Sequence, residues 1–310
     1  MLSKTIRILD LDGSVIRQEG LISRYQAEVI QAADIGPRAR LWLDQAVKVR
    51  LEERLKNSMA NALTFIGSGD FHHITYLLAA RFTEPFTLIV FDFHPDWDIL
   101  PPRLGCGSWV SAALREPQVA KCLLLGVSSE DISSFSIQTG DLSALKNDRV
   151  EIYPYSHPPS RTFLRKIPEN ISINARNGII SSEIRWMELK TRRLGDFFKT
   201  VISRVPTRKV YLSIDKDCLQ SAYAATNWEE GQMPLEDLLF MVRLIKEEKE
   251  IIGADIVGDH SPVLIDGWFK RKCSDWDHPK ETSAAGMRQE EIRRINELTN
   301  IKLAEVLTAG

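Results

Sequence analysis

The stretch Phe86-Thr-Leu-Ile-Val-Phe-Asp-Phe-His-Pro-Asp96 carries the strongest fold signal in the chain. Its first six residues are almost continuously apolar, which is typical of a strand covered on both faces in a parallel sheet. Polar side chains begin abruptly at Asp92. Because alternate side chains of an extended chain point the same way, Asp92, His94 and Asp96 can converge on one point at the end of this strand. The stretch therefore predicts a buried parallel strand that ends in a cluster of possible ligands.

Similar apolar runs recur on both sides of this stretch and alternate with helix-like segments. Further strands are expected at residues 5–11, 63–67, 122–127, 210–214 and 251–257. Helices are expected at residues 41–59, 74–82, 109–114, 194–205, 235–250 and 288–306. Alternating strands and helices predict an α/β fold around a mainly parallel sheet.

The domain organisation follows from the same pattern. We expect one domain over residues 1–310, with a motif-bearing core at about 60–265 and a C-terminal tail at 267–310. The tail is polar at first and helical from about residue 288. The stretch 141–168, rich in proline, serine and charge, is interpreted as a surface connection.

Composition excludes several classes of function. The 310 residues are 44% hydrophobic and 26% charged, as in ordinary globular proteins. Lys and Arg total 40 and Asp and Glu total 42, so no strong field attracts nucleic acid or an anionic membrane. The four cysteines form no Cys-x-x-Cys pair, which favours free thiols in a reducing compartment. No run approaches a membrane span, and we expect a cytoplasmic protein.

Three polar clusters follow predicted strands. They are Gly67-Ser-Gly-Asp-Phe-His-His73, Asp92-Phe-His-Pro-Asp96 and Ser213-Ile-Asp-Lys-Asp217. In open α/β sheets, ligands bind at the carboxyl ends of the strands. Several carboxylates in one pocket would repel one another unless a cation neutralised them. Carboxylates and imidazoles without a thiolate suit Mn²⁺ and related metals. A lone Asp-x-Asp after a strand is most often a turn or a helix cap, so the metal interpretation depends on all three clusters together.

These motifs resemble those of the arginase–agmatinase–formiminoglutamase family, the ureohydrolases. The family carries Gly-Gly-Asp-His-Ser, Asp-Ala-His-x-Asp and Ser-x-Asp-x-Asp in that order. The segment Gly253-Ala-Asp-Ile-Val also looks like the family's last strand, and Thr226-Asn-Trp-Glu-Glu looks like its substrate-side loop. The resemblance covers roughly residues 60–265. It implies a three-layer α/β/α sandwich, with two Mn²⁺ per chain as the expected cofactor.

The resemblance implies a role for each matching residue. Asp92 and Asp215 would bridge the two metals; His72 and Asp96 would complete one site, and His94 and Asp217 the other. The metal-bound hydroxide would attack a guanidinium or amidine carbon, because metal binding lowers the pKa of water from 15.7 towards ~7. In the first motif Phe71 stands where the family's ligand histidine follows the aspartate directly, so His73 remains an alternative to His72.

The substrate side departs from the family pattern. Gly107-Ser-Trp-Val stands where the family often has Asn-x-His-Gly. The family's last strand ends in a glutamate that grips the guanidinium, whereas this chain reads Gly258-Asp-His-Ser-Pro262. Asp259 would replace that glutamate with a shorter reach, and arginine and agmatine become doubtful substrates. The candidate catalytic residues are Asp96, Asp259 and His260. The candidate substrate-binding residues are Trp97, Trp109, Asn227, Trp228, Glu229 and Asp259.

Two hypotheses from different classes remain. The first is a dinuclear Mn²⁺ hydrolase that cleaves a non-peptide C–N bond of a small, nitrogen-rich substrate. The second is an arginase-like metal-binding protein with a binding or regulatory role. A metal-dependent deacetylase is less favoured, because the extra carboxylates indicate two metals. We expect no nucleic-acid or membrane partner, and a homo-oligomer is left open.

Other polar residues have alternative interpretations. Ile8-Leu-Asp-Leu-Asp-Gly-Ser-Val15 resembles the nucleophile motif of haloacid-dehalogenase-like phosphatases, but a turn at Gly13 is favoured. His260 is either a pocket residue or a loop histidine. His157 and His278, each beside a proline, are interpreted as surface residues. Cys106 and Cys218 are interpreted as small packing residues.

Overall fold

Eight parallel strands form the central sheet of the computed structural model. The structure describes residues 1–102, 104–133, 136–164, 166–191, 193–279, 282 and 284–309. The order across the sheet is β2-β1-β3-β11-β10-β4-β5-β6, and the pairs between these strands are parallel. The strands are β1 (Ile6–Asp10), β2 (Glu28–Gln31), β3 (Leu63–Gly67), β4 (Phe86–Phe91), β5 (Val119–Leu125), β6 (Val150–Tyr153), β10 (Lys209–Asp215) and β11 (Glu250–Val257). The predicted parallel sheet is confirmed.

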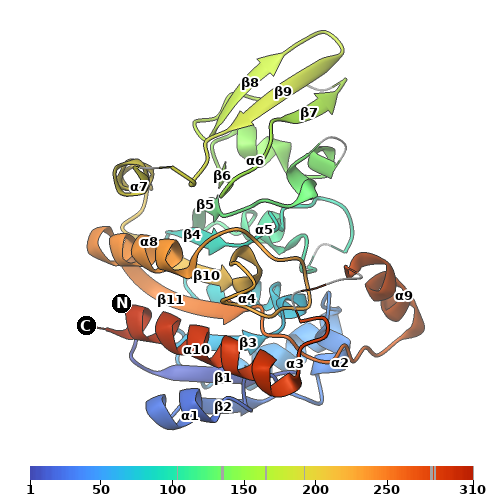
Figure 1. Ribbon diagram of the computed structural model, residues 1–310, viewed down its shortest axis with the longest axis vertical. Helices are drawn as coiled ribbons and strands as arrows, with labels where there is room; N and C mark the ends of the chain where they lie inside the picture. The colour runs from blue at the N-terminus through green and yellow to red at the C-terminus, as the bar shows by residue number, and fades with distance from the viewer. Residues whose placement is uncertain are drawn as a thin grey trace.

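Helices cover both faces of this sheet (Figure 1). Strand β4 shows why, because Leu88 and Val90 belong to one buried apolar cluster whereas Ile89 and Phe91 belong to the other. The first cluster includes residues of α3 (Gln45–Leu55), α4 (Ile74–Ala79), α5 (Trp109–Ala113) and α6 (Leu142–Lys146). The second includes residues of α1 (Glu19–Tyr25), α7 (Leu194–Ser203), α8 (Leu235–Glu248) and α10 (Gln289–Thr308). The fold is therefore the expected three-layer α/β/α sandwich.

A separate antiparallel sheet was not expected. Strands β7 (Ser160–Phe163), β9 (Ser181–Trp186) and β8 (Ile173–Asn177) pair in that order and project from one end of the molecule (Figure 1). The stretch 141–168 is consequently not a plain surface connection, since it contains α6, β6 and β7. Strand β6 is buried at the edge of the main sheet. Its four residues include Glu151, which pairs with Lys121 of β5, so its polar content concealed a core strand.

Helix boundaries differ from expectation at two places. The helix expected at 41–59 begins only at Gln45, because the Asp44 side chain accepts a hydrogen bond from Val47 N–H and caps it. The polar stretch after residue 267 contains α9 (Trp268–Asp277), which the sequence did not indicate. The remaining short elements are α2 (Gly36–Ala39) and the single-turn helices η1 (Gly69–Phe71), η2 (Glu130–Ile132), η3 (Ser136–Gln138) and η4 (Lys216–Cys218).

The first strand ends in the expected turn. Oδ1 of Asp10 accepts a hydrogen bond from Gly13 N–H, and Gly13 adopts a φ of +75°. Asp12 accepts from Ser14 N–H and from Ser68 N–H. Both carboxylates therefore accept hydrogen bonds from backbone N–H groups, which argues against a role as a phosphatase nucleophile. In the part of the chain that the structure describes, no helix is long and apolar enough to span a membrane.

Candidate metal centre

Four neighbouring strands bring the three sequence motifs to one edge of the sheet. Asp215 of β10 pairs with Val257 of β11, which pairs in turn with Gly67 of β3. Ile214, just before Asp215, pairs with Phe91 of β4. The polar residues that follow these strands therefore meet above their carboxyl ends, where open α/β sheets bind ligands.

The first group of possible metal ligands comprises His72, Asp92 and Asp96, which are all buried. Nδ1 of His72 lies 3.0 Å from Oδ2 of Asp92 and 3.1 Å from Oδ2 of Asp96. Neither His72 Nδ1 nor Asp92 Oδ2 has a hydrogen-bond partner among the described residues. Buried polar atoms are nearly always hydrogen-bonded. These two atoms therefore lie 3.0 Å apart without a well-directed hydrogen bond between them, as expected for ligands that share a cation.

The second group comprises Asp92, His94 and Asp217. Nδ1 of His94 lies 3.1 Å from Oδ2 of Asp217 and 3.9 Å from Oδ1 of Asp92. The other ring nitrogen, Nε2, lies 3.3 Å from a carboxylate oxygen of Glu229. Glu229 thus holds the imidazole so that Nδ1 faces the cluster, the arrangement in which a second residue orients a ligating histidine.

Backbone N–H groups hold one oxygen of each central carboxylate. The N–H of His94 donates to Oδ1 of Asp92 at 2.8 Å, and the N–H of Asp217 donates to Oδ1 of Asp215 at 3.1 Å. The other oxygen of Asp92 faces His72 at 3.0 Å, and that of Asp215 faces it at 3.7 Å. Each carboxylate is therefore fixed in orientation and keeps one oxygen directed at the cluster.

The crowding of the buried carboxylates raises their pKa values. Burial, aided by the charge of Asp217, raises the pKa of Asp215 to about 8. Burial and the charges of Asp96 and Asp217 raise the pKa of Asp92 well above its usual range. For His72, burial is the largest effect and would lower the pKa, but the charges and hydrogen bonds of Asp92 and Asp96 together outweigh it and the pKa rises. A bound cation relieves such repulsion.

The donor set fits a divalent cation of the Mn²⁺ type. Both groups offer carboxylate oxygens and an imidazole nitrogen and contain no thiolate. Asp92 belongs to both groups, so the two candidate groups share this carboxylate.

An acidic cavity of about 460 Å³ opens above the two groups. Its lining includes further acids, namely Asp98, Glu130, Asp131, Glu229 and Asp277. Among the described lining residues there is no lysine or arginine. A cavity of this charge favours cationic or neutral, nitrogen-rich ligands over anions.

The comparisons with known proteins agree with this geometry. The model of the arginase family matches residues 164–264. An arginase from Bacillus subtilis superposes with a TM-score of 0.56 at 15% identity, covering 99% of this chain and 99% of that one. The chain has an arginase-like fold.

Two further matches show the same fold or a distant sequence similarity. A formimidoylglutamase from Bacillus subtilis superposes with a TM-score of 0.52 at 15% identity, covering 98% of this chain and 88% of that one. In sequence, an uncharacterised protein of Thermotoga maritima is 28% identical over 263 residues, or 85% of this chain and 83% of its own length. The solved structures thus share the fold at low identity.

The structure separates the two alternatives for the first histidine. His72 joins the first ligand group, whereas both ring nitrogens of His73 are buried without a partner among the described residues. Burial lowers the pKa of His73 to about 3, so its ring is neutral. His72 is the histidine at the cluster, and His73 is packed behind it.

Two of the three candidate tryptophans do not line the cavity. Trp97 is buried and packs against Gly140. Trp109 is also buried; its Nε1–H donates to Oδ2 of Asp96 at 2.6 Å, and its ring lies 4.8 Å from that of His72. The structure therefore does not place Trp97 or Trp109 against a substrate. Trp109 instead supports two possible ligands from behind.

Asp259 and His260 do not face the metal cluster either. They line a different hollow, formed with the first loop and the start of α10. The Asp259 carboxylate is buried, forms an ion pair of 3.0 Å with Lys216 and accepts hydrogen bonds from Gln18 and Asn300. The predicted catalytic and guanidinium-binding roles do not fit this position. Directly after β11, Gly258 has a φ of +89°, and the next residue, Asp259, is held by Lys216, Gln18 and Asn300.

Residues of the loop 226–230 have two different positions: Asn227 connects neighbouring loops, whereas Trp228 and Glu229 line the cavity. Asn227 is buried, accepts hydrogen bonds from Ser68 and Ser261, and so ties loops together instead of facing a ligand. Trp228 and Glu229 do line the cavity. Of the predicted substrate-binding residues, these two are the ones that the structure brings to the candidate site.

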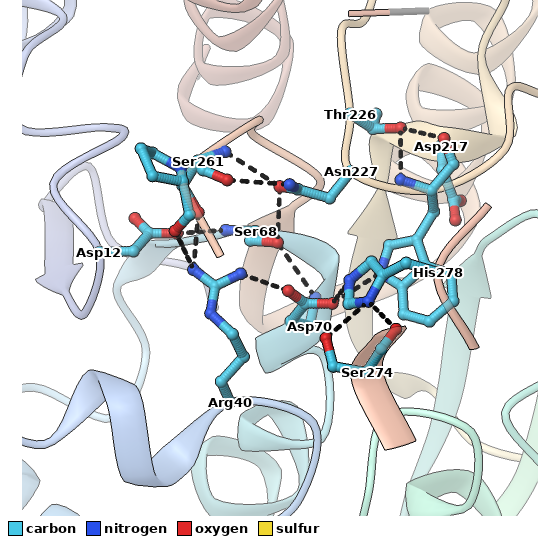
Figure 2. Close-up of polar contacts among 12 residues, drawn as sticks. Asp12, Arg40, Ser68, Asp70, Asp217, Thr226, Asn227, Ser261, Ser274 and His278 are labelled. Carbon is cyan, nitrogen blue, oxygen red and sulfur yellow. Dashed lines mark hydrogen bonds and ion pairs between the residues drawn. The ribbon is translucent and has the colours of Figure 1, made fainter. Parts of the chain in front are cut away.

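Sequence reasoning missed the polar contacts among Arg40, Asp70 and His278 (Figure 2), which support Trp228. Its Nε1–H donates to Oδ1 of Asp70 at 2.9 Å, and its ring stacks on His278 with centroids 4.5 Å apart. Nε2 of His278 lies 2.8 Å from the same Asp70 oxygen, while the Arg40 guanidinium pairs with the other oxygen. His278 is therefore half-buried and supports Trp228, a cavity residue, from behind, so it is not an ordinary surface residue. The other histidine interpreted as surface, His157, is buried.

The cysteines are all free, as expected. Cys218 is buried, in agreement with a packing role, whereas Cys106 is half-buried and lines the cavity. Cys106 lies in a loop far from any predicted strand end, so its exposure to the cavity had no local sequence signal.

Metal loading should raise both ion content and stability. Protein dialysed against Mn²⁺ is expected to retain two ions per chain by elemental analysis, because the two ligand groups share Asp92. Binding at a hundredfold excess over Kd stabilises by ~2.7 kcal/mol per site, which corresponds to a rise in Tm of several degrees. One ion or none per chain would contradict the dinuclear arrangement, and Mg²⁺-dialysed protein serves as the control.

Proposed function

We propose that this chain is a hydrolase in which two divalent cations, Mn²⁺ in the first instance, activate water to cleave a non-peptide C–N bond. The observation that carries the proposal is the pair of ligand groups joined by Asp92. Bound metal supplies hydroxide near neutral pH and polarises the atom under attack. The arginase-like fold supports the same class of chemistry.

Residues of this chain orient the candidate metal ligands and surround the space for a substrate. His94 is held by Glu229, and Asp96 accepts a hydrogen bond from Trp109. The flat face of Trp228 and the outer acids Asp98, Glu130, Asp131 and Asp277 surround the space above the cluster. Aromatic and anionic walls favour a planar or cationic group, so the proposed substrate is a small amine, amidine or guanidine compound.

Arginine and agmatine are expected to be poor substrates. A guanidinium is held best by a bidentate carboxylate, and the last strand here leads into Gly258 with Asp259 turned towards Lys216. Misplacement by ~1 Å can cost ~100-fold in rate. Urea release by the Mn²⁺-loaded protein should therefore be weak or absent with arginine, agmatine and guanidinobutyrate, and should be compared with ammonia release from formiminoglutamate-type amidines.

The same assay has a clear opposite outcome. Turnover of arginine at the ~10 s⁻¹ typical of enzymes would show that another acid grips the guanidinium, and the proposed substrate side would be abandoned. The Asp92→Ala variant serves as the inactive control.

A second candidate is a metal-binding protein with a binding or regulatory role. The observation that favours it is the engagement of Asp259 by Lys216, Gln18 and Asn300, which leaves the family's substrate-gripping position without a carboxylate. Full Mn²⁺ loading with no hydrolysis of any amidine, guanidine or amine substrate would support this candidate over the enzyme.

A further inference from the structure

A buried carboxylate, Asp255, is connected to the candidate ligand His72 through one intervening side chain, Ser213. Asp255 of β11 is fully buried, and its two oxygens accept hydrogen bonds from three hydroxyl groups. Oδ1 accepts from Ser213 at 2.7 Å and from Thr75 at 2.9 Å, and Oδ2 accepts from Tyr211 at 2.8 Å. A buried carboxylate needs such donors to stay ionised. Asp255 takes no part in either ligand group, so its burial is unexplained by the metal centre alone.

Ser213 connects this carboxylate to His72. Oγ of Ser213 lies 2.9 Å from Nε2 of His72 and donates its one proton to Asp255. An ionised carboxylate only accepts, and a hydroxyl has a single proton. Ser213 must therefore accept a hydrogen bond from His72, which places a proton on Nε2. In the neutral ring that binds a metal, the lone pair is then on Nδ1, the atom that lies 3.0 Å from Asp92 and 3.1 Å from Asp96.

We propose that Asp255 is a positioning residue that acts through Ser213 to hold His72 in the tautomer and orientation needed to bind metal. The inference rests on the proposed metal centre and adds to it a residue that touches neither metal nor substrate. Asp255 accepts the hydroxyl proton of Ser213. The Ser213 oxygen is then left to accept a hydrogen bond from Nε2–H of His72, so that Nδ1 of His72 faces the ligand group. Partners of this kind typically contribute 10- to 100-fold to metal affinity.

The chain offers a matched set of variants for the test. Ser213→Ala removes the link, and Asp255→Ala removes its anchor. Asp255→Asn keeps an acceptor oxygen where Ser213 and Thr75 donate and can turn its amide towards Tyr211, so it should rescue. Tyr211→Phe removes a hydrogen bond to the same carboxylate without touching the link to His72. It controls for general loosening around Asp255.

The measurement is a Mn²⁺ titration followed by electron paramagnetic resonance and calorimetry. Ser213→Ala and Asp255→Ala should lower the affinity for one of the two ions by about 10- to 100-fold. The affinity for the ion at Asp92, His94 and Asp217 should be unchanged. Tyr211→Phe and Asp255→Asn should keep both affinities within a few-fold. Equal weakening in Tyr211→Phe, or no weakening in Ser213→Ala, would overturn the proposal.

A second measurement does not depend on affinity. In Zn²⁺-loaded wild-type protein, the ¹⁵N shifts of His72 should show a proton on Nε2 and none on Nδ1. A proton on Nδ1 would overturn the proposal even if the variants bind weakly. Failure of the wild-type protein to bind two ions would instead reject the dinuclear centre itself, so the two failures are distinguishable.

Discussion

Replacing Asp92 by alanine is expected to abolish binding of both metal ions. Asp92 is the residue that both ligand groups share. Replacing a residue that merely orients a ligand costs 10- to 100-fold in affinity, so loss of a shared ligand should exceed about 100-fold at each site. Calorimetric titration with Mn²⁺ measures both sites in one experiment. Asp215→Ala, the other predicted bridge, should behave similarly because its Oδ2 also faces His72.

The single-site variants provide the contrast. Asp217→Ala should weaken mainly the ion near His94, and Asp277→Ala, which alters the cavity wall alone, should leave both affinities unchanged. Without metal, Asp92→Ala should be at least as stable as the wild type, because one of the mutually repelling carboxylates is gone. Equal, mild losses of affinity in Asp92→Ala, Asp215→Ala and Asp217→Ala would contradict the shared-ligand assignment.

Gly258→Ala is expected to be strongly destabilising. Gly258 has a φ of +89°, and a Cβ there would lie 2.5 Å from Oδ1 of Asp215 and 2.7 Å from the backbone N of Lys216. The backbone conformation costs about 1–3 kcal/mol for a non-glycine residue, and overpacking adds about 1–3 kcal/mol. Thermal unfolding measures the total, and the displaced Asp215 carboxylate should weaken Mn²⁺ binding as well.

Gly267→Ala is a matched control for the backbone contribution. Gly267 has a φ of +98°, but a Cβ there meets nothing within 4 Å. This variant should lose only the conformational part, about 1–3 kcal/mol, and bind Mn²⁺ normally. If both variants lose the same stability, the contact with Asp215 and Lys216 has no energetic effect and the close approach is less restrictive than its geometry indicates.

Continuous apolar runs predicted the sheet well. Phe86–Phe91 is a strand buried on both faces, and such a strand has an unmistakable composition. The short edge strand Val150–Tyr153 and the antiparallel strands Ser160–Phe163 and Ser181–Trp186 were missed, because they are short and interrupted by polar residues. Local composition detects a strand only when burial on both faces demands it.

The candidate ligands were found from sequence for a similar reason. Asp92, His94 and Asp96 are close in sequence, and the end of a strand directs them to one side, so local geometry brings them together. Asp215 and Asp217 follow the same rule on the neighbouring strand. The sequence by itself therefore determined the α/β architecture and most of the candidate ligands, but it left His72 and His73 as alternatives.

The cavity wall was decided by tertiary structure alone. Trp228 lines the cavity and is supported by His278 and Asp70, which are 208 residues apart in the sequence. Asp259 looked like a substrate ligand, yet Lys216, Gln18 and Asn300 from three other segments draw it away from the cluster. Which polar partner a side chain finds depends on contacts between distant segments, and local sequence carries no record of them. A strand positions its own neighbours, whereas only the packed fold determines which carboxylates are left to face the substrate.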